Sequence, residues 1–331
     1  MDLQPFNTFA VPASCKQFVS IADASTVPAI LSQYQVASQP HFILGGGSNV
    51  LFTKPFDGVV LHMTNKGISV LDENEESVVL EVAAGEEWED FVNYCIDNQY
   101  FGVENLIGIP GLVGSCPVQN IGAYGAEVKE VILSVKGYRI QSGEPFVLEN
   151  KDCAFGYRTS IFKTDWKNDV LITSVIFKLS KKEAYKLSYQ ALANALESKG
   201  LRPSLKNIAD TVIAVRNSKL PNIREVGCAG SFFKNPIVDV AVRDALMARF
   251  PNLVSYPAGE GKCKLAAGQL IDLSGLKGHR EGAVGVWPYQ ALVIVNYGGA
   301  TGAEVVAFYH TVQARVLEFT GVQIEPEVNV L

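Results

Sequence analysis

The stretch GIPGLVGSCPVQNIGAYG, residues 108–125, contains five glycines and two prolines, and its only ionisable side chains are Cys116 and Tyr124. Glycine permits positive φ angles and close backbone approach, whereas proline fixes φ near about −65°. The segment is too apolar for a solvated linker, because it also contains Ile109 and Leu112. We therefore expect main chain packed against a large partner, with N–H groups available to an anion without a lysine. A buried glycine-rich turn is the alternative.

A second glycine cluster, LGGGSNVL at residues 44–51, follows a predicted strand. It lacks the lysine of a P-loop, and Val50 stands in place of the third glycine of the dinucleotide fingerprint. Asn65 occupies the position, about 20 residues on, where an acidic ribose ligand would be needed. The N–H groups, together with Ser48 and Asn49, suit a pyrophosphate held by neutral donors, although a tight turn would need the same glycines. Two neutral segments suit flavin adenine dinucleotide (FAD) better than ATP, which usually recruits lysine and magnesium.

The whole-chain composition excludes several protein classes. A net charge of −6 and a pI near 5.4 argue against nonspecific binding to nucleic acid or anionic membranes. The six cysteines form no C-x-x-C pair and have no histidine at metal-ligand spacing, so we expect no metal site and a reducing compartment. The N-terminus lacks the pattern of a signal peptide, and no apolar run reaches about 18 residues. We expect a soluble cytoplasmic protein.

The predicted elements mix strands and helices without a regular βαβ rhythm, which favours the α+β class. Residues 86–99 show the apolar spacing of an amphipathic helix with acidic residues in its first turn. A polar insert with a tyrosine-bearing helix or loop begins at residue 181. Predicted strands are 41–46, 58–63, 77–85, 131–140, 170–179, 291–296 and 322–331. Predicted helices are 26–38, 86–99, 205–215, 241–250, 263–273 and 303–319.

Six motifs, taken in order, resemble those of the UDP-N-acetylenolpyruvoylglucosamine reductases, flavoenzymes of bacterial peptidoglycan precursor synthesis. The resemblance extends from residue 7 to residue 328, and the insert around Tyr189 looks like the longer family type, in which a tyrosine loop covers the substrate. The motifs are LGGGSNVL (44–51), ENLIGIPGLVGSCPVQNIGAYG (104–125), FGYRTSIFK (155–163), GCAGSFFKNP (227–236), KLAAGQLID (264–272) and EPEV (325–328).

The resemblance implies three domains. Residues 1–68 and 69–219 would form the two α+β subdomains of an FAD-binding unit of the PCMH or vanillyl-alcohol-oxidase type. The second would include the tyrosine-loop insert at about 181–204, and the strand 320–331 would return to it. Residues 220–319 would form a C-terminal, substrate-binding α+β domain.

The implied reaction is the reduction of UDP-N-acetylglucosamine enolpyruvate to UDP-N-acetylmuramate, with NADPH as hydride donor and non-covalent FAD as carrier, in a monomeric enzyme. Many oxidases of the same fold group tether flavin through histidine, and none of the four histidines lies in a glycine cluster. Such an oxidase and a non-catalytic flavin-binding module are the alternatives. The expected FAD contacts are Gly45, Gly46, Gly47, Ser48, Asn49, Gly111, Ser115, Pro117, Gly122, Ala123 and Tyr124.

The resemblance implies catalytic roles for Arg158, Ser231 and Glu327. Enolate charge would develop on the substrate carboxylate, which the planar fork of Arg158 can hold with two bonds. Glu327 would share these oxygens, and burial beside another anion would raise its pKa. Glu325 is the competing glutamate; chemistry alone does not separate the two, and the family motif favours Glu327.

Ser231 would donate a proton to the α carbon of the substrate. A hydroxyl is a weak acid, so its oxygen needs stabilisation or a proton relay, to which Lys219, Asn235 and a water could contribute. Cys228 is expected to be inert, because the reaction needs no covalent step. Asn329 departs from the family pattern, in which an arginine often follows the EPEV motif. The expected substrate contacts are Tyr189, Arg216, Lys219, Asn235, Tyr256, Lys264 and Gln290, with Tyr189 closing over the diphosphate.

Overall fold

The computed structural model describes residues 1–331 and divides into two compact units. The first unit contains Met1, Cys15–Gly46 and Asp57–Arg216, and the second contains Asp2–Ser14, Gly47–Phe56 and Asn217–Leu331. Each unit combines strands with helices, so the predicted α+β class is confirmed. The end of the first unit at Arg216 lies close to the predicted boundary at residue 219.

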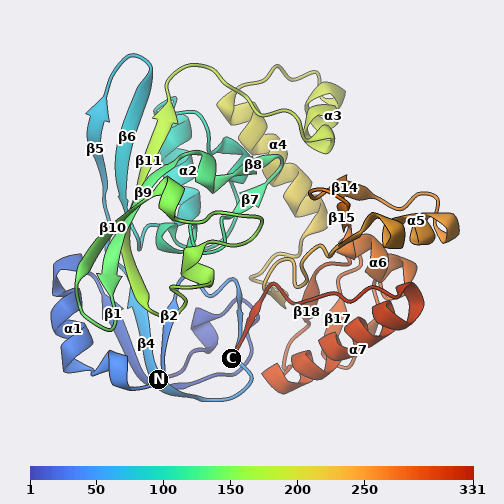
Figure 1. Cartoon of the computed structure of the whole chain (residues 1–331), viewed down its shortest axis with the longest axis horizontal. Coiled ribbons are helices and arrows are strands. Elements are labelled where there is room, and N and C mark those ends of the chain that lie inside the picture. The colour runs from blue at the N-terminus through green and yellow to red at the C-terminus, as the bar shows by residue number, and fades with distance from the viewer. The chain divides into compact units, whose positions relative to one another are not determined.

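A five-stranded antiparallel sheet is the main layer of the first unit, in the order β10-β9-β11-β6-β5 (Figure 1). A three-stranded sheet, β1-β4-β2, accompanies it, and β2 runs parallel to β4. The strands of the two sheets are β1 (Cys15–Ile21), β2 (His41–Leu44), β4 (Phe56–Met63), β5 (Ile68–Glu73), β6 (Ser77–Ala83), β9 (Ile132–Arg139), β10 (Pro145–Glu149) and β11 (Val170–Ser180). The polar edge strands β5 and β10 are absent from the sequence predictions because they bury too few residues to show an apolar pattern.

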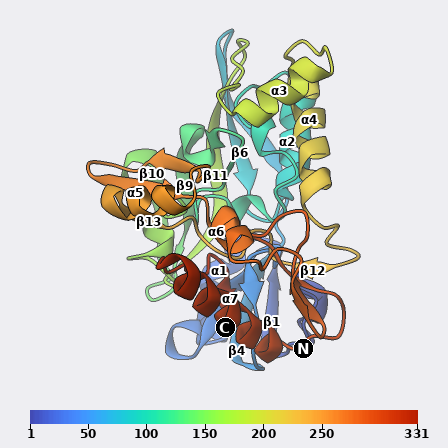
Figure 2. The same cartoon turned by 90° about the vertical axis from the view of Figure 1, so that its right-hand side faces the viewer.

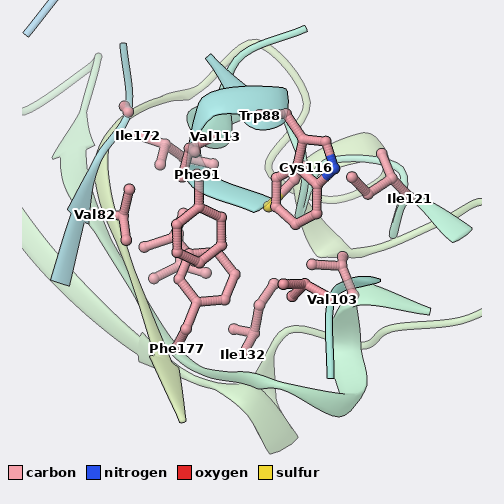
Figure 3. Close-up of a cluster of buried hydrophobic side chains, with 14 of the residues drawn as sticks. Val82, Trp88, Phe91, Val103, Val113, Cys116, Ile121, Ile132, Ile172 and Phe177 are labelled. Carbon is pink, nitrogen blue, oxygen red and sulfur yellow. The ribbon is translucent and has the colours of Figure 1, made fainter. Parts of the chain in front are cut away.

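Helix α2 (Trp88–Asp97) builds the core of the first unit against this sheet. It buries Trp88, Phe91, Val92 and Cys95, at the spacing of one helix face, as the sequence predicts. Phe91 contacts Phe177 of β11 with ring centroids 4.6 Å apart, and both lie beside Trp88 (Figure 3). The first turn of α2 is thereby anchored in the core through Trp88.

The other helices of the first unit are α1, α3 and α4. Helix α1 (Val27–Gln33) is shorter than the predicted helix 26–38, because Gln35 adopts a left-handed φ of 47° and interrupts it. Helix α3 (Gln190–Ser198) lies in the polar insert, directly after Tyr189. Helix α4 (Leu205–Lys219) continues for one turn past its predicted end.

The second unit contains two small antiparallel sheets, β12-β18-β17-β16 and β13-β15-β14, and helix α6 lies beside α7 (Figure 2). A capping box between Thr301 and Glu304 begins α7, and Gly321 ends it with φ 72°. The elements are β12 (Gly227–Cys228), β13 (Ile237–Asp239), α5 (Val240–Arg249), β14 (Ser255–Pro257), β15 (Lys262–Leu265), α6 (Ala267–Leu273), β16 (Arg280–Glu281), β17 (Val284–Val286), β18 (Ile294–Asn296) and α7 (Gly302–Thr320).

Two predictions for the second unit are wrong. The segment 263–273 is not one helix: it begins as β15, whose Cys263 and Leu265 are buried at the centre of a sheet, and turns into α6 afterwards. The C-terminal strand is only β19 (Asn329–Val330), which pairs in parallel with β3 (Val50–Leu51). It therefore does not return to residues 69–219, because its backbone partners lie next to the first glycine cluster.

We expect Phe177→Ala to lower the free energy of unfolding of the holoenzyme by about 3–5 kcal/mol. The substitution removes a fully buried ring that packs on Phe91 and Trp88 and leaves a cavity in their place. Urea denaturation measures the change. The exposed Val147→Ala on β10 is the control and should stay within about 0.5 kcal/mol of the wild type; equal values for both variants would contradict the assigned core.

Candidate active site

The glycine-rich loop 108–125 places its apolar side chains in the core of the first unit. Val113, Cys116 and Ile121 are buried and surround Trp88 (Figure 3). Burial raises the pKa of the Cys116 thiol well above its usual range, so this group stays protonated and unreactive. The apolar side chains of the loop thus pack within the protein, which is what the alternative of a buried glycine-rich turn predicts.

Backbone hydrogen bonds fasten this loop to the turn between β6 and α2. The N–H of Trp88 donates to the Gly111 carbonyl at 2.9 Å, and the N–H of Gly114 donates to the Ala84 carbonyl at 2.9 Å. A Cβ at Gly114 would lie 2.6 Å from the Cβ of Ala84, so a larger residue would push the loop off this turn. The conformation of the loop thus follows from the position of α2.

The two glycine-rich segments meet backbone to backbone. A Cβ at Gly46 would lie 2.8 Å from the Cα of Gly111, and a Cβ at Gly45 would lie 3.2 Å from the Cβ of Ser115. The Ser115 hydroxyl donates to the Leu112 carbonyl at 2.7 Å. This bond fixes the serine side chain where the two segments meet. The structure therefore brings together two segments that the sequence analysis assigns to one dinucleotide.

The rest of the first glycine cluster belongs to the second unit. A Cβ at Gly47 would lie 1.9 Å from the carbonyl oxygen of Phe6, so this position accepts only glycine. The carbonyl of Asn49 accepts two hydrogen bonds from Asn329, one from its backbone N–H at 3.2 Å and one from its side-chain amide at 3.0 Å. The departure from the family pattern at Asn329 thus has a structural role, since it anchors β19 to the segment that contains Ser48.

Arg158 lies in a tight hairpin of the first unit, next to the glycine loop. Gly156 and Thr159 pair with each other at 3.0 Å and 3.4 Å, and Arg158 between them has a left-handed φ of 55°. A Cβ at Gly122 would lie 3.5 Å from Nη1 of Arg158, so the guanidinium lies beside a predicted FAD contact. The hydroxyl of Ser160 donates to the loop at the Val118 carbonyl, at 2.6 Å.

Tyr124, Tyr189 and Arg216 form a cluster at the end of the glycine loop. The rings of Tyr124 and Tyr189 meet edge to face with centroids 5.4 Å apart, and Arg216 is hydrogen-bonded to Tyr124. Burial lowers the pKa of Arg216, while Tyr124 and Glu89 oppose that shift; an arginine remains charged in either case. Two predicted substrate contacts and one predicted FAD contact therefore lie together.

Glu104 and Asn105, which are not among the predicted site residues, are buried next to this cluster. Asn105 donates from its amide to the Tyr124 carbonyl at 2.8 Å and to the Lys186 carbonyl at 2.9 Å, which joins the loop to the insert. Glu104 is 2% exposed and accepts from the Gly102 N–H at 2.7 Å. Burial raises the pKa of this carboxyl, while the bond from Gly102 and the charge of Lys186 act in the opposite direction. An acidic residue within an apolar run is the signal that could have identified it.

Ser231 and Glu327 belong to two segments of the second unit that pair with each other. Their segments pair antiparallel through Phe233 and Pro326, and the N–H of Glu327 donates to the Phe232 carbonyl at 2.7 Å. Glu327 consequently lies across from the residue that follows Ser231. Arg158 belongs to the other unit.

The two candidate glutamates differ in their surroundings. The Glu325 side chain is 72% exposed and forms an ion pair with Lys234 at 3.9 Å. Glu327 is half-buried. An enclosed substrate site needs side chains that are not fully exposed, so this difference favours Glu327.

The other predicted substrate residues of the second unit occur in two pairs, apart from Lys219, which is exposed near the end of α4. Asn235 accepts the N–H of Ala267 at the start of α6, and Gln290 lies 3.0 Å from a Cβ built on the neighbouring Gly268. Tyr256 and Lys264 are partners across β14 and β15, with the ammonium 5.8 Å from the ring centre. Cys228 is buried, and burial raises the pKa of its thiol.

Comparison with known proteins identifies the family. Residues 222–331 match the UDP-N-acetylenolpyruvoylglucosamine reductase C-terminal domain, and residues 15–145 match the FAD binding domain. A UDP-N-acetylenolpyruvoylglucosamine reductase from Chromobacterium violaceum is 44% identical over 100% of this chain and 98% of its own length. The chain belongs to the UDP-N-acetylenolpyruvoylglucosamine reductase family. The reductase from Flavobacterium johnsoniae is also 44% identical, over 99% of this chain and 98% of that protein.

The fold agrees with a solved structure of this reductase family. The crystal structure of UDP-N-acetylenolpyruvylglucosamine reductase from Thermus caldophilus aligns with a TM-score of 0.68 and 22% identity, over 100% of this chain and 97% of that chain. The predicted family, the FAD-binding unit and the separate C-terminal domain are thus confirmed, and the chain is an FAD-binding oxidoreductase. No helix is long and apolar enough to cross a membrane, and no group of three metal-ligating side chains occurs.

The contact between Gly46 and Gly111 predicts that Gly46→Ala will lower the FAD content of the reductase. The new methyl group would overlap backbone that has no side chain to move, at a cost of about 1–3 kcal/mol. The ratio of flavin to protein absorbance measures the loss. Gly200→Asn is the control, because Gly200 has a left-handed φ of 62° with open space around it and asparagine tolerates that conformation. Full flavin content in Gly46→Ala would disprove the close contact.

Glu104 predicts a pH dependence of stability. Its folded-state pKa lies above that of the unfolded chain, about 4.3, so the folded state binds the proton more tightly. The free energy of unfolding should therefore fall as the pH rises from about 4 through the raised pKa. Glu104→Gln keeps an acceptor for Gly102 without this titration. Unfolding midpoints at a series of pH values should show the decline in the wild type relative to the variant, and parallel curves would contradict the assignment.

Proposed function

We propose that this enzyme reduces UDP-N-acetylglucosamine enolpyruvate to UDP-N-acetylmuramate, with NADPH as the hydride donor, in peptidoglycan precursor synthesis. The supporting observation is the 44% identity to the Chromobacterium violaceum reductase over the whole chain. The use of NADPH, a monomeric state and a cytoplasmic location belong to the same proposal and rest on the family resemblance.

The residues of the first unit fit a non-covalently bound FAD. The contact between Gly46 and Gly111 brings uncharged main chain close together, which suits a pyrophosphate held by N–H groups. Gly122, Ala123 and Tyr124 continue the same loop and would contact the flavin. When bound, FAD supplies the hydride for the alkene carbon β to the substrate carboxylate, having taken it from NADPH.

Arg158 would stabilise the enolate that forms when the alkene is reduced. The negative charge develops on the substrate carboxylate oxygens, and a guanidinium fork can bind both of them. The position of Arg158 beside Gly122 supports this role, because it puts a permanent cation next to the expected flavin contacts. The hairpin fixes the arginine before the substrate arrives, which lowers the reorganisation needed during the reaction.

Ser231 would give its hydroxyl proton to the α carbon, and Glu327 would share the enolate oxygens with Arg158. The antiparallel pairing of their segments supports this pair, because it brings the two segments side by side. The serine oxygen would regain its proton from solvent, and we propose Lys219 and Asn235 as the polar groups that relay it. The cluster of Tyr189 and Arg216 would hold the substrate diphosphate, with Arg216 providing the charge.

Stopped-flow spectroscopy of the holoenzyme tests the proposal. NADPH should bleach the flavin absorbance, and the enolpyruvyl substrate should restore it much faster than air does. Arg158→Ala should keep its FAD and its reduction by NADPH but lose about 2–5 kcal/mol in the reoxidation step, which is ~30-fold or more in rate. Ser231→Ala should keep FAD and lose product formation.

Ser69→Ala, on the exposed edge strand β5, is the control for these substitutions. Normal reoxidation in Arg158→Ala or in Ser231→Ala would remove that residue from the mechanism. Rapid reoxidation by oxygen alone would instead indicate an oxidase, and flavin that no substrate restores would indicate a binding module.

A further inference from the structure

Asn120 is a fully buried polar residue in the middle of the apolar glycine loop. It is 0% exposed and has a left-handed φ of 46°, a conformation that asparagine tolerates better than most residues. None of the roles proposed above uses it. A buried amide needs hydrogen-bond partners on all sides, and those partners show what the residue does.

The side chain of Asn120 joins three segments of the first unit. Its amide nitrogen donates to the Gly156 carbonyl at 3.0 Å and to Oε2 of Glu127 at 3.1 Å. Its side-chain oxygen accepts the N–H of Lys129 at 3.1 Å. Both amide protons and the oxygen are thus used, and the residue is fixed in one orientation.

The bond to Gly156 connects Asn120 to Arg158. Gly156 opens the hairpin in which Arg158 has a left-handed φ of 55°, an unfavourable conformation for arginine that persists only if its surroundings enforce it. From Asn120 the chain continues through Ile121 to Gly122, beside the guanidinium. The amide of Asn120 therefore joins the expected flavin contacts to the hairpin of the cation.

We propose that Asn120 is a positioning residue that sets the location of Arg158 relative to the flavin loop. This inference rests on the proposed function, in which Arg158 binds the developing enolate. A shift of about 1 Å in such a group can slow a reaction ~100-fold. The loss of Asn120 should impair substrate reduction without impairing flavin binding.

The hairpin has a second attachment, so a variant at position 120 should still fold. The hydroxyl of Ser160 donates to the Val118 carbonyl at 2.6 Å, and Ser160 is 1% exposed. The glycine loop also keeps its bonds to the turn before α2. Removal of the Asn120 amide should loosen the hairpin without detaching it.

The first experiment measures the two half-reactions in Asn120→Ala. FAD content and reduction by NADPH should stay within about twofold of the wild type, and reoxidation by the enolpyruvyl substrate should slow by ~10- to ~100-fold. In an Arg158→Ala background the same substitution should have no further effect. Wild-type reoxidation in Asn120→Ala, loss of FAD, or an equal loss of rate in both backgrounds would overturn the inference.

Asn120→Asp provides a matched variant of the same size. Its carboxylate cannot donate to Gly156 and would face the carboxylate of Glu127, so it should slow reoxidation at least as much as alanine. Adding Glu127→Gln should relieve the repulsion and restore stability. It should not restore the rate, because the bond to Gly156 is still missing; full recovery of the rate would overturn the inference.

Hydrogen exchange separates this inference from the proposed function. The N–H groups of Gly156 and Thr159, which pair across the hairpin, should exchange faster in Asn120→Ala than in the wild type, while those of α7 should not change. Unchanged protection of the hairpin would overturn the positioning role of Asn120 even if Arg158 is essential. Normal turnover in Arg158→Ala, with faster exchange in Asn120→Ala, would overturn the proposed role of Arg158 alone.

Discussion

Direct backbone contact between Gly46 and Gly111 is the constraint on which the functional side of the first unit depends. A side chain at position 46 would overlap the Cα of Gly111. The two glycine-rich segments can therefore approach this closely only because residue 46 is glycine. The position of Gly111 is fixed in turn by its bond to Trp88, the residue that begins α2 and is buried in the core. The geometry near the expected flavin contacts is therefore inherited from the packing of one helix on one sheet.

The proposed reactive side chains are all held through their main chains. Glu327 is placed by the pairing of its backbone with Phe232, and Arg158 is placed by a hairpin that is attached to the glycine loop. Ordering a long side chain on a flexible segment costs both backbone and rotamer entropy. When the backbone is already fixed, only the rotamer entropy is lost on substrate binding. Within the first unit, the amide of Asn120 joins the glycine loop to the hairpin of Arg158, and a neutral amide satisfies buried donors and acceptors without the desolvation cost of an unpaired charge.

The class of fold, the helix at Trp88 and the importance of the glycine loop could be predicted from sequence, because local periodicity and composition encode them. The cofactor can be predicted because the glycine clusters offer neutral main-chain donors and lack both the lysine of a P-loop and the third glycine of the dinucleotide fingerprint. The partners of Asn120 could not be predicted, since Gly156 is distant in the chain. Every residue also has a backbone carbonyl, so the sequence does not indicate which one accepts this bond. The strand at Cys263 is predicted as part of a helix because only residues 262–265 form it, and the local pattern does not reveal the sheet neighbours that bury Cys263 and Leu265. Arg158 and Ser231 rested on family resemblance, because a lone arginine or serine has no distinctive spacing.

The pairing of Val50 with Asn329 has a consequence for synthesis of the protein. The second unit gathers residues 2–14 and 47–56 with residues beyond 216, and Thr8 bonds to Cys228 as well as to Gly47. On the ribosome, the early segments must wait for nearly the whole chain before their partners emerge. Such distant contacts slow folding and prolong the exposure of unpaired strands. The nascent enzyme should therefore depend on chaperones more than its ordinary size suggests.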